Sequence, residues 1–161
     1  MEQVRHSFEY TTYPDIAALP EADRMLLLQA QQAIAQAYAP YSRFRVGAAV
    51  LLSNGEVVTG ANQENAASPA GLCAERVALA AVSASYPGTA VDTLAISYDP
   101  EAGKSDHPVS PCGICRQTLL EYEGRLQHPI RVVMGGKTGP VWVIPSASLL
   151  LPFAFSAAML G

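Results

Sequence analysis

Segments with helical and strand patterns alternate along this chain, and that order restricts the folds it can adopt. The dipeptide Asn54-Gly55 lies between two apolar runs, 46–53 and 56–60, and it most readily takes the positive φ angles of a two-residue hairpin turn. The whole order is helix, strand, strand, helix, strand, helix, strand, strand, helix, with no repeat, linker or low-complexity tract. This order predicts one layered α/β domain.

The bounds of the elements follow from apolar spacing and from the prolines and glycines. A helix is expected over 21–38, stopped by Pro40, and Pro111 suits the start of a helix over 113–123. The other predicted elements are a helix at 72–85, strands at 91–98, 130–134 and 141–144, and a short helix from Ser146. Residues 1–20 mix β-forming residues with two prolines, so we expect an extended arm that can supply an edge strand, followed by a domain over 21–161.

Composition excludes several classes of protein. The 161 residues are half hydrophobic, enough for one core, but no apolar run approaches the length of a membrane span. Ten basic against fourteen acidic residues, without a basic cluster, argue against a nucleic-acid partner. The first twenty residues do not fit a secretory signal, so we expect a cytoplasmic protein. Charged residues make up only 15%, which favours an oligomer that buries part of its surface.

Three cysteines are too few for a disulfide framework, and each lies where a helix is expected to begin. Cys112 and Cys115 are three residues apart, so their sulfurs share one helix face and can converge on one ion. Cys73 precedes the other predicted helix, and the partial positive charge at a helix N-terminus favours the thiolate that zinc requires. The arrangement predicts a zinc site.

The number of ligands and their neighbours indicate the kind of zinc site. Catalytic zinc commonly keeps three protein ligands and leaves the fourth position for water. Glu75 lies two residues after Cys73, which places a carboxylate beside such a site and points to hydrolysis. Three thiolates around a divalent zinc ion leave one net negative charge, and Arg76 and Arg116 each follow a ligand closely enough to moderate it.

Five sequence blocks, in order, resemble the small homotetrameric, zinc-dependent cytidine deaminases. Cysteine rather than histidine as the first ligand fits that group, and so does the single-domain length. The resemblance implies a three-layer α/β/α fold with a central mixed five-stranded sheet and one zinc ion per chain. The blocks are YSRFRVGAA at 41–49, GANQENA at 60–66, CAER at 73–76, SPCGICRQ at 110–117 and LLPFAF at 150–155.

The resemblance also implies a reaction, the hydrolytic deamination of cytidine and deoxycytidine to uridine and deoxyuridine with release of ammonia, as in pyrimidine salvage. Cys73, Cys112 and Cys115 would hold the zinc, which acidifies the attacking water. Glu75 would take the proton of that water, protonate ring N3 and pass a proton to the departing ammonia.

Substrate contacts are implied in the same way. Phe44 would stack on the pyrimidine, and the backbone of Ala74 would contact the edge of the base. Asn62 and Glu64, two apart on an extended segment, project to the same side and would hold a ribose hydroxyl. Phe155 corresponds to the C-terminal aromatic residue that reaches into the site of a neighbouring subunit.

The chain departs from the family at the rim of the site and leaves other hypotheses open. Arg45 stands where proline is usual, Ala61 where many members have cysteine, and Ala67-Ser68 where many have a cysteine-tyrosine pair. The alternatives are a related deaminase of another aminated nucleoside or nucleoside analogue, a non-catalytic zinc-stabilised binding module, a redox dithiol at the CxxC, and a structural zinc with His107 as fourth ligand.

Overall fold

Residues 1–160 of the computed structural model are described here, and they follow the predicted order of helices and strands. A further short strand precedes them, and the chain also forms five 3₁₀ helices. The elements are β1 Thr11–Tyr13, α1 Glu21–Ala33, β2 Phe44–Leu52, β3 Val57–Ala61, α2 Ala74–Ser85, β4 Val91–Pro100, α3 Gly113–Leu126, β5 Arg131–Gly135 and β6 Val141–Ile144.

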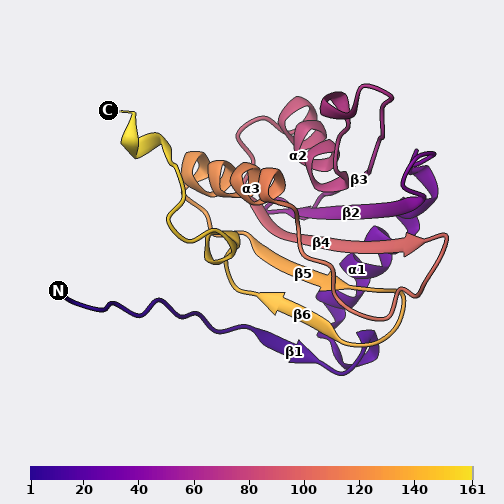
Figure 1. Ribbon diagram of the computed structural model, residues 1–161, viewed down its shortest axis with the longest axis horizontal. Helices are drawn as coiled ribbons and strands as arrows, with labels where there is room; N and C mark the ends of the chain where they lie inside the picture. The colour runs from indigo at the N-terminus through magenta and orange to yellow at the C-terminus, as the bar shows by residue number, and fades with distance from the viewer. Residues whose placement is uncertain (161) are drawn as a thin grey trace.

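The strands form one six-stranded mixed sheet in the order β1-β6-β5-β4-β2-β3. Only β4 and β5 run parallel, and every other neighbouring pair is antiparallel. Figure 1 shows α1 on one side of this sheet and α2 and α3 together on the other. The molecule is therefore a three-layer α/β/α domain, as predicted.

Successive apolar residues of the central strands belong alternately to two core layers, one on each face of the sheet. On β2, Ala48 and Val50 belong to the core beneath α2 and α3, whereas Ala49, between them, packs in the core beneath α1. β4 repeats the pattern with Leu94 and Ala95. Because successive side chains of a strand point to opposite faces, a sheet that is covered on both faces needs apolar residues at nearly every position.

The predicted count of five strands was wrong, because the arm itself contributes one. Thr11 and Tyr13 pair with Val143 and Val141 of β6, so β1 becomes the edge of the sheet. Tyr10 packs its ring against Trp142 with centroids 5.4 Å apart, which fixes the approach of the arm. A three-residue strand that ends just before Pro14 is too short for its pattern alone to establish that it joins the sheet.

Two helix boundaries also differ from the prediction. The first helix ends at Ala33 and continues as a 3₁₀ turn, Ile34–Gln36, because Tyr38 then pairs with the loop after β3. The amide of Tyr38 donates to Asn62 O, and the carbonyl oxygen of Tyr38 accepts from the amide of Glu64. The terminal helix predicted from Ser146 is only a 3₁₀ helix, Ala147–Leu150. No helix in residues 1–160 has the length and apolar character needed to cross a bilayer.

Two glycines let helices approach the sheet closely from opposite sides. A Cβ on Gly60 would lie 2.5 Å from the amide nitrogen of Ala78 and 2.7 Å from the carbonyl oxygen of Ala74, both backbone atoms of α2. A Cβ on Gly47 would lie 2.1 Å from Ala30 O on α1. Backbone atoms cannot move aside as flexible side chains do, so each glycine sets the height of one helix above the sheet.

We predict that Gly60→Ala lifts α2 and weakens metal binding at its N-terminus. Overpacking of this kind costs about 1–3 kcal/mol of unfolding free energy, and it should also lower the zinc content of the purified protein. Gly47→Ala is the matched control: it should destabilise the fold similarly through α1 while retaining zinc. Thermal melting and metal analysis of both variants test this. Equal zinc content in the two variants would contradict the prediction.

Candidate metal centre and cavity

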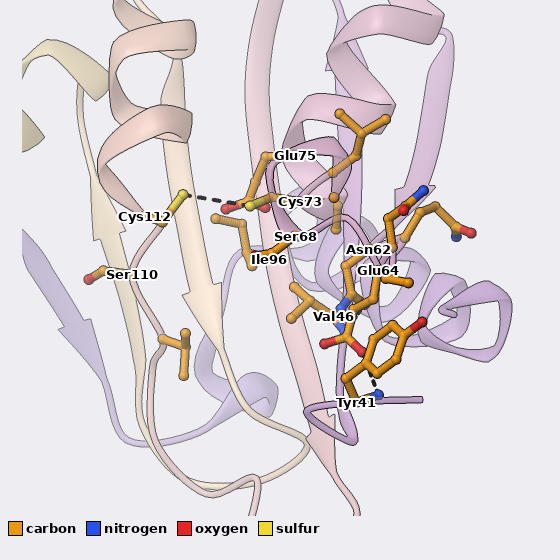
Figure 2. Close-up of a pocket in the computed structure, with 17 residues that line it drawn as sticks. Tyr41, Val46, Asn62, Glu64, Ser68, Cys73, Glu75, Ile96, Ser110 and Cys112 are labelled. Atoms are coloured by element: carbon orange, nitrogen blue, oxygen red, sulfur yellow. Dashed lines mark hydrogen bonds between the residues drawn. The ribbon is translucent and has the colours of Figure 1, made fainter. Parts of the chain in front are cut away.

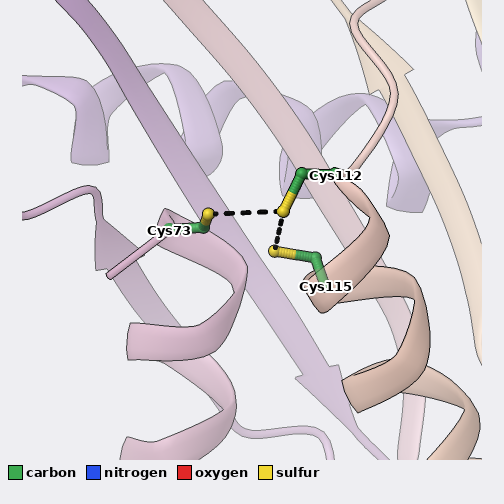
Figure 3. Close-up of side chains that lie close together, drawn as sticks. All are labelled: Cys73, Cys112 and Cys115. Atoms are coloured by element: carbon green, nitrogen blue, oxygen red, sulfur yellow. Dashed lines mark hydrogen bonds between the residues drawn. The ribbon is translucent and has the colours of Figure 1, made fainter. Parts of the chain in front are cut away.

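Three thiols converge where the N-termini of α2 and α3 meet (Figure 3). Cys73 is the N-cap residue of α2, Cys112 is the N-cap residue of α3, and Cys115 lies in the first turn of α3. The Cys112 sulfur lies 3.6 Å from the Cys73 sulfur and 3.4 Å from the Cys115 sulfur. All three are free cysteines, and the three sulfurs lie within 4.8 Å of one another.

The spacing of the sulfurs fits a tetrahedral zinc ion. A Zn–S bond of about 2.3 Å and a tetrahedral angle place two thiolate ligands about 3.8 Å apart. The separations of the Cys112 sulfur from the Cys73 and Cys115 sulfurs, 3.6 and 3.4 Å, are close to that value without any movement of the backbone. Residues Cys73, Cys112 and Cys115 can therefore hold one zinc ion with a fourth position left over.

The thiols differ in their tendency to ionise. Hydrogen bonds from Cys115 and Cys112, with the positive charge of Arg76, lower the pKa of the Cys73 thiol to about 6 against the cost of burial. The pKa of the Cys115 thiol is raised, because it donates to Cys73 and is fully buried. The low pKa of the Cys73 thiol favours the thiolate at this position, and the positive charge of Arg76 is one of its causes.

Glu75 lies directly beside this centre. Its side chain is buried in the first turn of α2, with only 4% of its surface exposed. Burial raises the pKa of the Glu75 carboxyl to about 7, and a nearby Cys73 thiolate adds to the rise. Figure 2 shows this carboxylate next to the Cys73 sulfur, and both residues line one cavity. A buried carboxyl at that point is suited to proton transfer.

A cavity of about 520 Å³ opens from the sulfurs along the sheet, within the range of small-ligand pockets. β2 contributes Val46 and β4 contributes Ile96, and both are apolar side chains of the face that α2 and α3 cover. The loop after β3 supplies the polar wall opposite them. The residues that line it include Tyr41, Val46, Asn62, Glu64, Cys73, Ala74, Glu75, Ile96, Ser110 and Cys112 (Figure 2).

Asn62 and Glu64 both line the cavity, and both also hold the segment that leads into β2. The Asn62 side chain accepts from Val46 N at 2.8 Å and donates to Phe44 O at 2.9 Å. The Glu64 carboxylate accepts from the amide of Tyr41 at 2.8 Å. Hydrogen bonds from Ser42 and from the Tyr41 amide lower the pKa of Glu64, so this wall carries a negative charge.

The predicted site residues do not all point into this chain's own cavity. Ala74 lines it and is fully buried. Phe44 lies just beyond Val46 on the same face and stacks on Tyr98, so of the described residues Val46 and not Phe44 forms that wall. Phe155 is 57% exposed, and its carbonyl oxygen accepts from Gln117 of α3. Tyr98 is the neighbour that sequence patterns did not single out, because a buried tyrosine in a strand is usually only core.

Arg116 makes contacts other than those predicted. Its guanidinium group donates to Pro111 O at 2.9 Å and to Leu150 O at 3.0 Å. It therefore ties the loop before Cys112 to the C-terminal segment and, unlike Arg76, is not a source of the thiol pKa shifts.

His107 does not lie with the thiols. Its Nδ1 lies 3.1 Å from both the Tyr98 hydroxyl and Asp106 Oδ1, and the sulfur cluster within residues 1–160 contains no histidine. The structural zinc site with His107 as fourth ligand therefore does not form. A redox pair at Cys112 and Cys115 would leave the converging Cys73 sulfur without a role.

Comparison with known proteins agrees with this geometry. Residues 20–127 match the family model described as the cytidine and deoxycytidylate deaminase zinc-binding region, a stretch that contains all three cysteines and Glu75. This chain belongs to that family. It is 41% identical to a cytidine deaminase of Halalkalibacterium halodurans over 134 residues, which span 83% of this chain and 94% of the relative. A cytidine deaminase of Mycobacterium tuberculosis is 43% identical over 117 residues, or 70% of this chain and 84% of the relative.

Solved structures show the same fold. The crystal structure of a cytidine deaminase from Burkholderia pseudomallei superposes with a TM-score of 0.71 at 37% identity, covering 85% of this chain and 100% of the other. The enzyme from Mycobacterium tuberculosis gives a TM-score of 0.64 at 35% identity, covering 82% and 95%. Because 85% of this chain accounts for the whole Burkholderia chain, this protein carries additional residues that the relative lacks.

We predict one zinc per chain, held by the three thiolates. Cys73→Ser should lose most of that zinc, and removal of zinc from the wild type with a chelator should lower its melting temperature, because a ligand bound only to the folded state stabilises it. Elemental analysis and thermal melting provide the measurements. Ser110→Ala, a change at the wall of the same cavity, serves as control and should keep its zinc. A wild-type protein that folds without metal and ignores the chelator would refute the site.

Proposed function

We propose that this chain catalyses the hydrolytic deamination of cytidine and deoxycytidine to uridine and deoxyuridine, with release of ammonia. The observation that carries the proposal is a buried carboxyl, Glu75, beside three convergent thiols in a cavity of nucleoside size. A surface without a basic cluster favours a free nucleoside over a nucleic acid. The deaminase relatives support the same activity.

The residues of the chain divide the chemistry between them. Cys73, Cys112 and Cys115 would hold zinc, which lowers the pKa of a bound water towards neutrality and thereby supplies the nucleophile. Glu75 accepts the proton of the attacking water and delivers a proton to ring N3. It then takes the proton of the new C4 hydroxyl and transfers it to the amino group, so that C4 becomes a carbonyl as its bond to nitrogen breaks and ammonia leaves. Its burial keeps competing water away from these transfers.

The polar wall of the cavity would hold the sugar. Glu64 supplies a carboxylate that accepts from a ribose hydroxyl, and Asn62 supplies an amide that can both donate and accept. The backbone of Ala74, between a metal ligand and the proton shuttle, would contact the edge of the base. Phe44, two residues before the cavity residue Val46 on β2, would pack against the pyrimidine.

Glu75→Gln should keep the fold and the zinc but abolish turnover, since an amide has the shape of the carboxylate but cannot accept the proton. We expect a loss of at least about 10³-fold in kcat. Ammonia release and the absorbance change from cytidine to uridine measure it, with metal analysis on the same sample. Glu121→Gln, at an exposed residue of α3, is a matched control with expected wild-type rates.

The outcome also separates the alternatives. Unchanged ammonia release in Glu75→Gln would refute this role, and a zinc-loaded wild type that deaminates nothing would indicate a non-catalytic binding module. The same assay over other aminated nucleosides and nucleoside analogues identifies the preferred ring. A clear preference for one of those over cytidine would assign the chain to a different substrate within the family.

We also propose a homotetramer in which Phe155 completes the site of a neighbouring subunit. Apolar side chains are exposed near the start of α3 and along the C-terminal segment, where Ile114 is 62%, Phe155 57% and Phe153 99% exposed. Gln117 fixes the backbone of Phe155 against α3. Such surface is more typical of an interface than of a monomer. We further propose a role in pyrimidine salvage in a reducing cytoplasm, which keeps free thiols available for metal.

Sedimentation should give a particle of four 17.0 kDa chains. Phe155→Ala should lower kcat/KM for cytidine about tenfold or more, because a desolvated aromatic contact is lost. Met25→Ala, at an exposed apolar residue of α1 away from this surface, is the matched control and should stay within twofold. An active monomer at assay concentration, or equal effects of the two substitutions, would contradict the shared site.

A further inference from the structure

Tyr98 and Phe44 form an aromatic pair next to Val46, a residue of the cavity wall that pairs with Tyr98 in the sheet. Their ring centroids lie 5.2 Å apart, and the planes differ by 13°, so the rings stack face to face with an offset. Tyr98 is only 1% exposed, whereas Phe44 is partly exposed. The buried tyrosine therefore covers one face of the Phe44 ring, and the tyrosine does not cover the opposite face.

The pair adjoins the cavity through its neighbours. Val46, which lines the cavity, pairs with Tyr98 in the β2–β4 register, and Phe44 lies two residues before Val46 on the same face. Asn62, another cavity residue, donates to the carbonyl oxygen of Phe44 at 2.9 Å. The backbone of Phe44 is thus fixed by the polar wall, while the direction of its ring is fixed by Tyr98.

Tyr98 is itself held from behind by a tightly packed loop. Its hydroxyl donates to Lys104 O at 3.3 Å, and Ser105 Oγ donates to Tyr98 O at 2.6 Å. Ser105 Oγ also accepts from the amide of Lys137 at 2.9 Å. A Cβ on Gly139 would lie 2.1 Å from a carbonyl oxygen of the same loop, so the loop sits directly on the turn between β5 and β6. These contacts leave the tyrosine ring little freedom to move.

We propose that Tyr98 is a positioning residue for nucleoside binding: its ring holds Phe44 in the orientation in which the pyrimidine packs against it. The proposal rests on the proposed cytidine deamination. Tyr98 does not itself reach the reacting atoms, which lie at the thiol end of the cavity. Contacts to the non-reacting face of a substrate act equally on the ground state and the transition state, so their loss raises KM and leaves kcat unchanged.

The test compares two substitutions at this position. Tyr98→Leu removes the stack and should raise KM for cytidine about three- to tenfold, with kcat within twofold and zinc still bound. The dissociation constant of the product, uridine, measured by titration calorimetry, should rise by a similar factor. Tyr98→Phe keeps the ring and loses only the hydroxyl, so it should restore KM and uridine affinity to within twofold of the wild type.

Tyr122→Leu is the matched control. Tyr122 is another buried tyrosine with a bonded hydroxyl, which donates to Leu79 O on α2, but it is remote from the cavity lining. Its loss should lower the melting temperature and the active fraction, and so the apparent kcat, while KM stays constant. The same pattern in Tyr98→Leu, or a KM in Tyr98→Phe as high as in Tyr98→Leu, would overturn the proposal. A wild type without deaminase activity would contradict the proposed function instead.

Discussion

The site depends on two helix N-termini being brought to one point on one face of the sheet. α2 follows the β2–β3 hairpin and α3 follows β4, and the sulfurs at their first residues can meet only if both helices lie at the right height. Gly60 allows α2 to settle so closely that its backbone nearly touches β3. The helix dipoles then add a favourable field for thiolates, which partly offsets the cost of gathering three sulfurs together. The metal centre is thus a consequence of layer packing as much as of cysteine spacing.

The same packing gives Glu75 its character. A carboxyl in the first turn of an exposed helix would be ionised and solvated, with the helix dipole favouring the charge. Here the first turn of α2 is pressed against β3 and faces α3, so the side chain is removed from water and held beside the sulfurs. One residue later, Arg76 compensates for negative charge at Cys73. Four consecutive residues therefore supply a proposed metal ligand, Cys73, a proposed proton carrier, Glu75, and a compensating positive charge, Arg76.

Much of the fold was predictable from the sequence, because turn residues, helix-ending residues and the spacing of apolar residues indicate the same element at most positions. The hairpin at Asn54-Gly55, the helices that begin at the cysteines and a single layered α/β domain were all visible in the pattern, and the resemblance to the deaminases added the three-layer arrangement. The errors arise where tertiary contacts override local preference. The first helix stops at Ala33 because Tyr38 is needed for pairing with the loop after β3, and the arm adds β1 because β6 offers it an open edge.

Side-chain partners were harder to predict than elements. Arg116 looked like charge compensation from its place after Cys115, yet its guanidinium group is used by the carbonyl oxygens of Pro111 and Leu150. Tyr98 carried no sequence signal, because its importance comes from being opposite Val46 in the sheet register. Which residue lies across a strand pair depends on register, and register is settled by the whole sheet rather than by any short motif.

The metal centre and the segment around Phe44 are therefore held in place by different kinds of interaction. At the thiol end, helix N-termini hold charged groups whose arrangement depends on a metal ion. Beside Val46, strand register, the hydrogen bond from Asn62 and the ring of Tyr98 hold Phe44, while the Glu64 carboxylate accepts from the amides of Tyr41 and Ser42 just before it. Tyr98 is in turn linked through Ser105 to the β5–β6 turn rather than to α2. The residues proposed to bind the nucleoside and those proposed to act on it are therefore positioned by different elements of the fold.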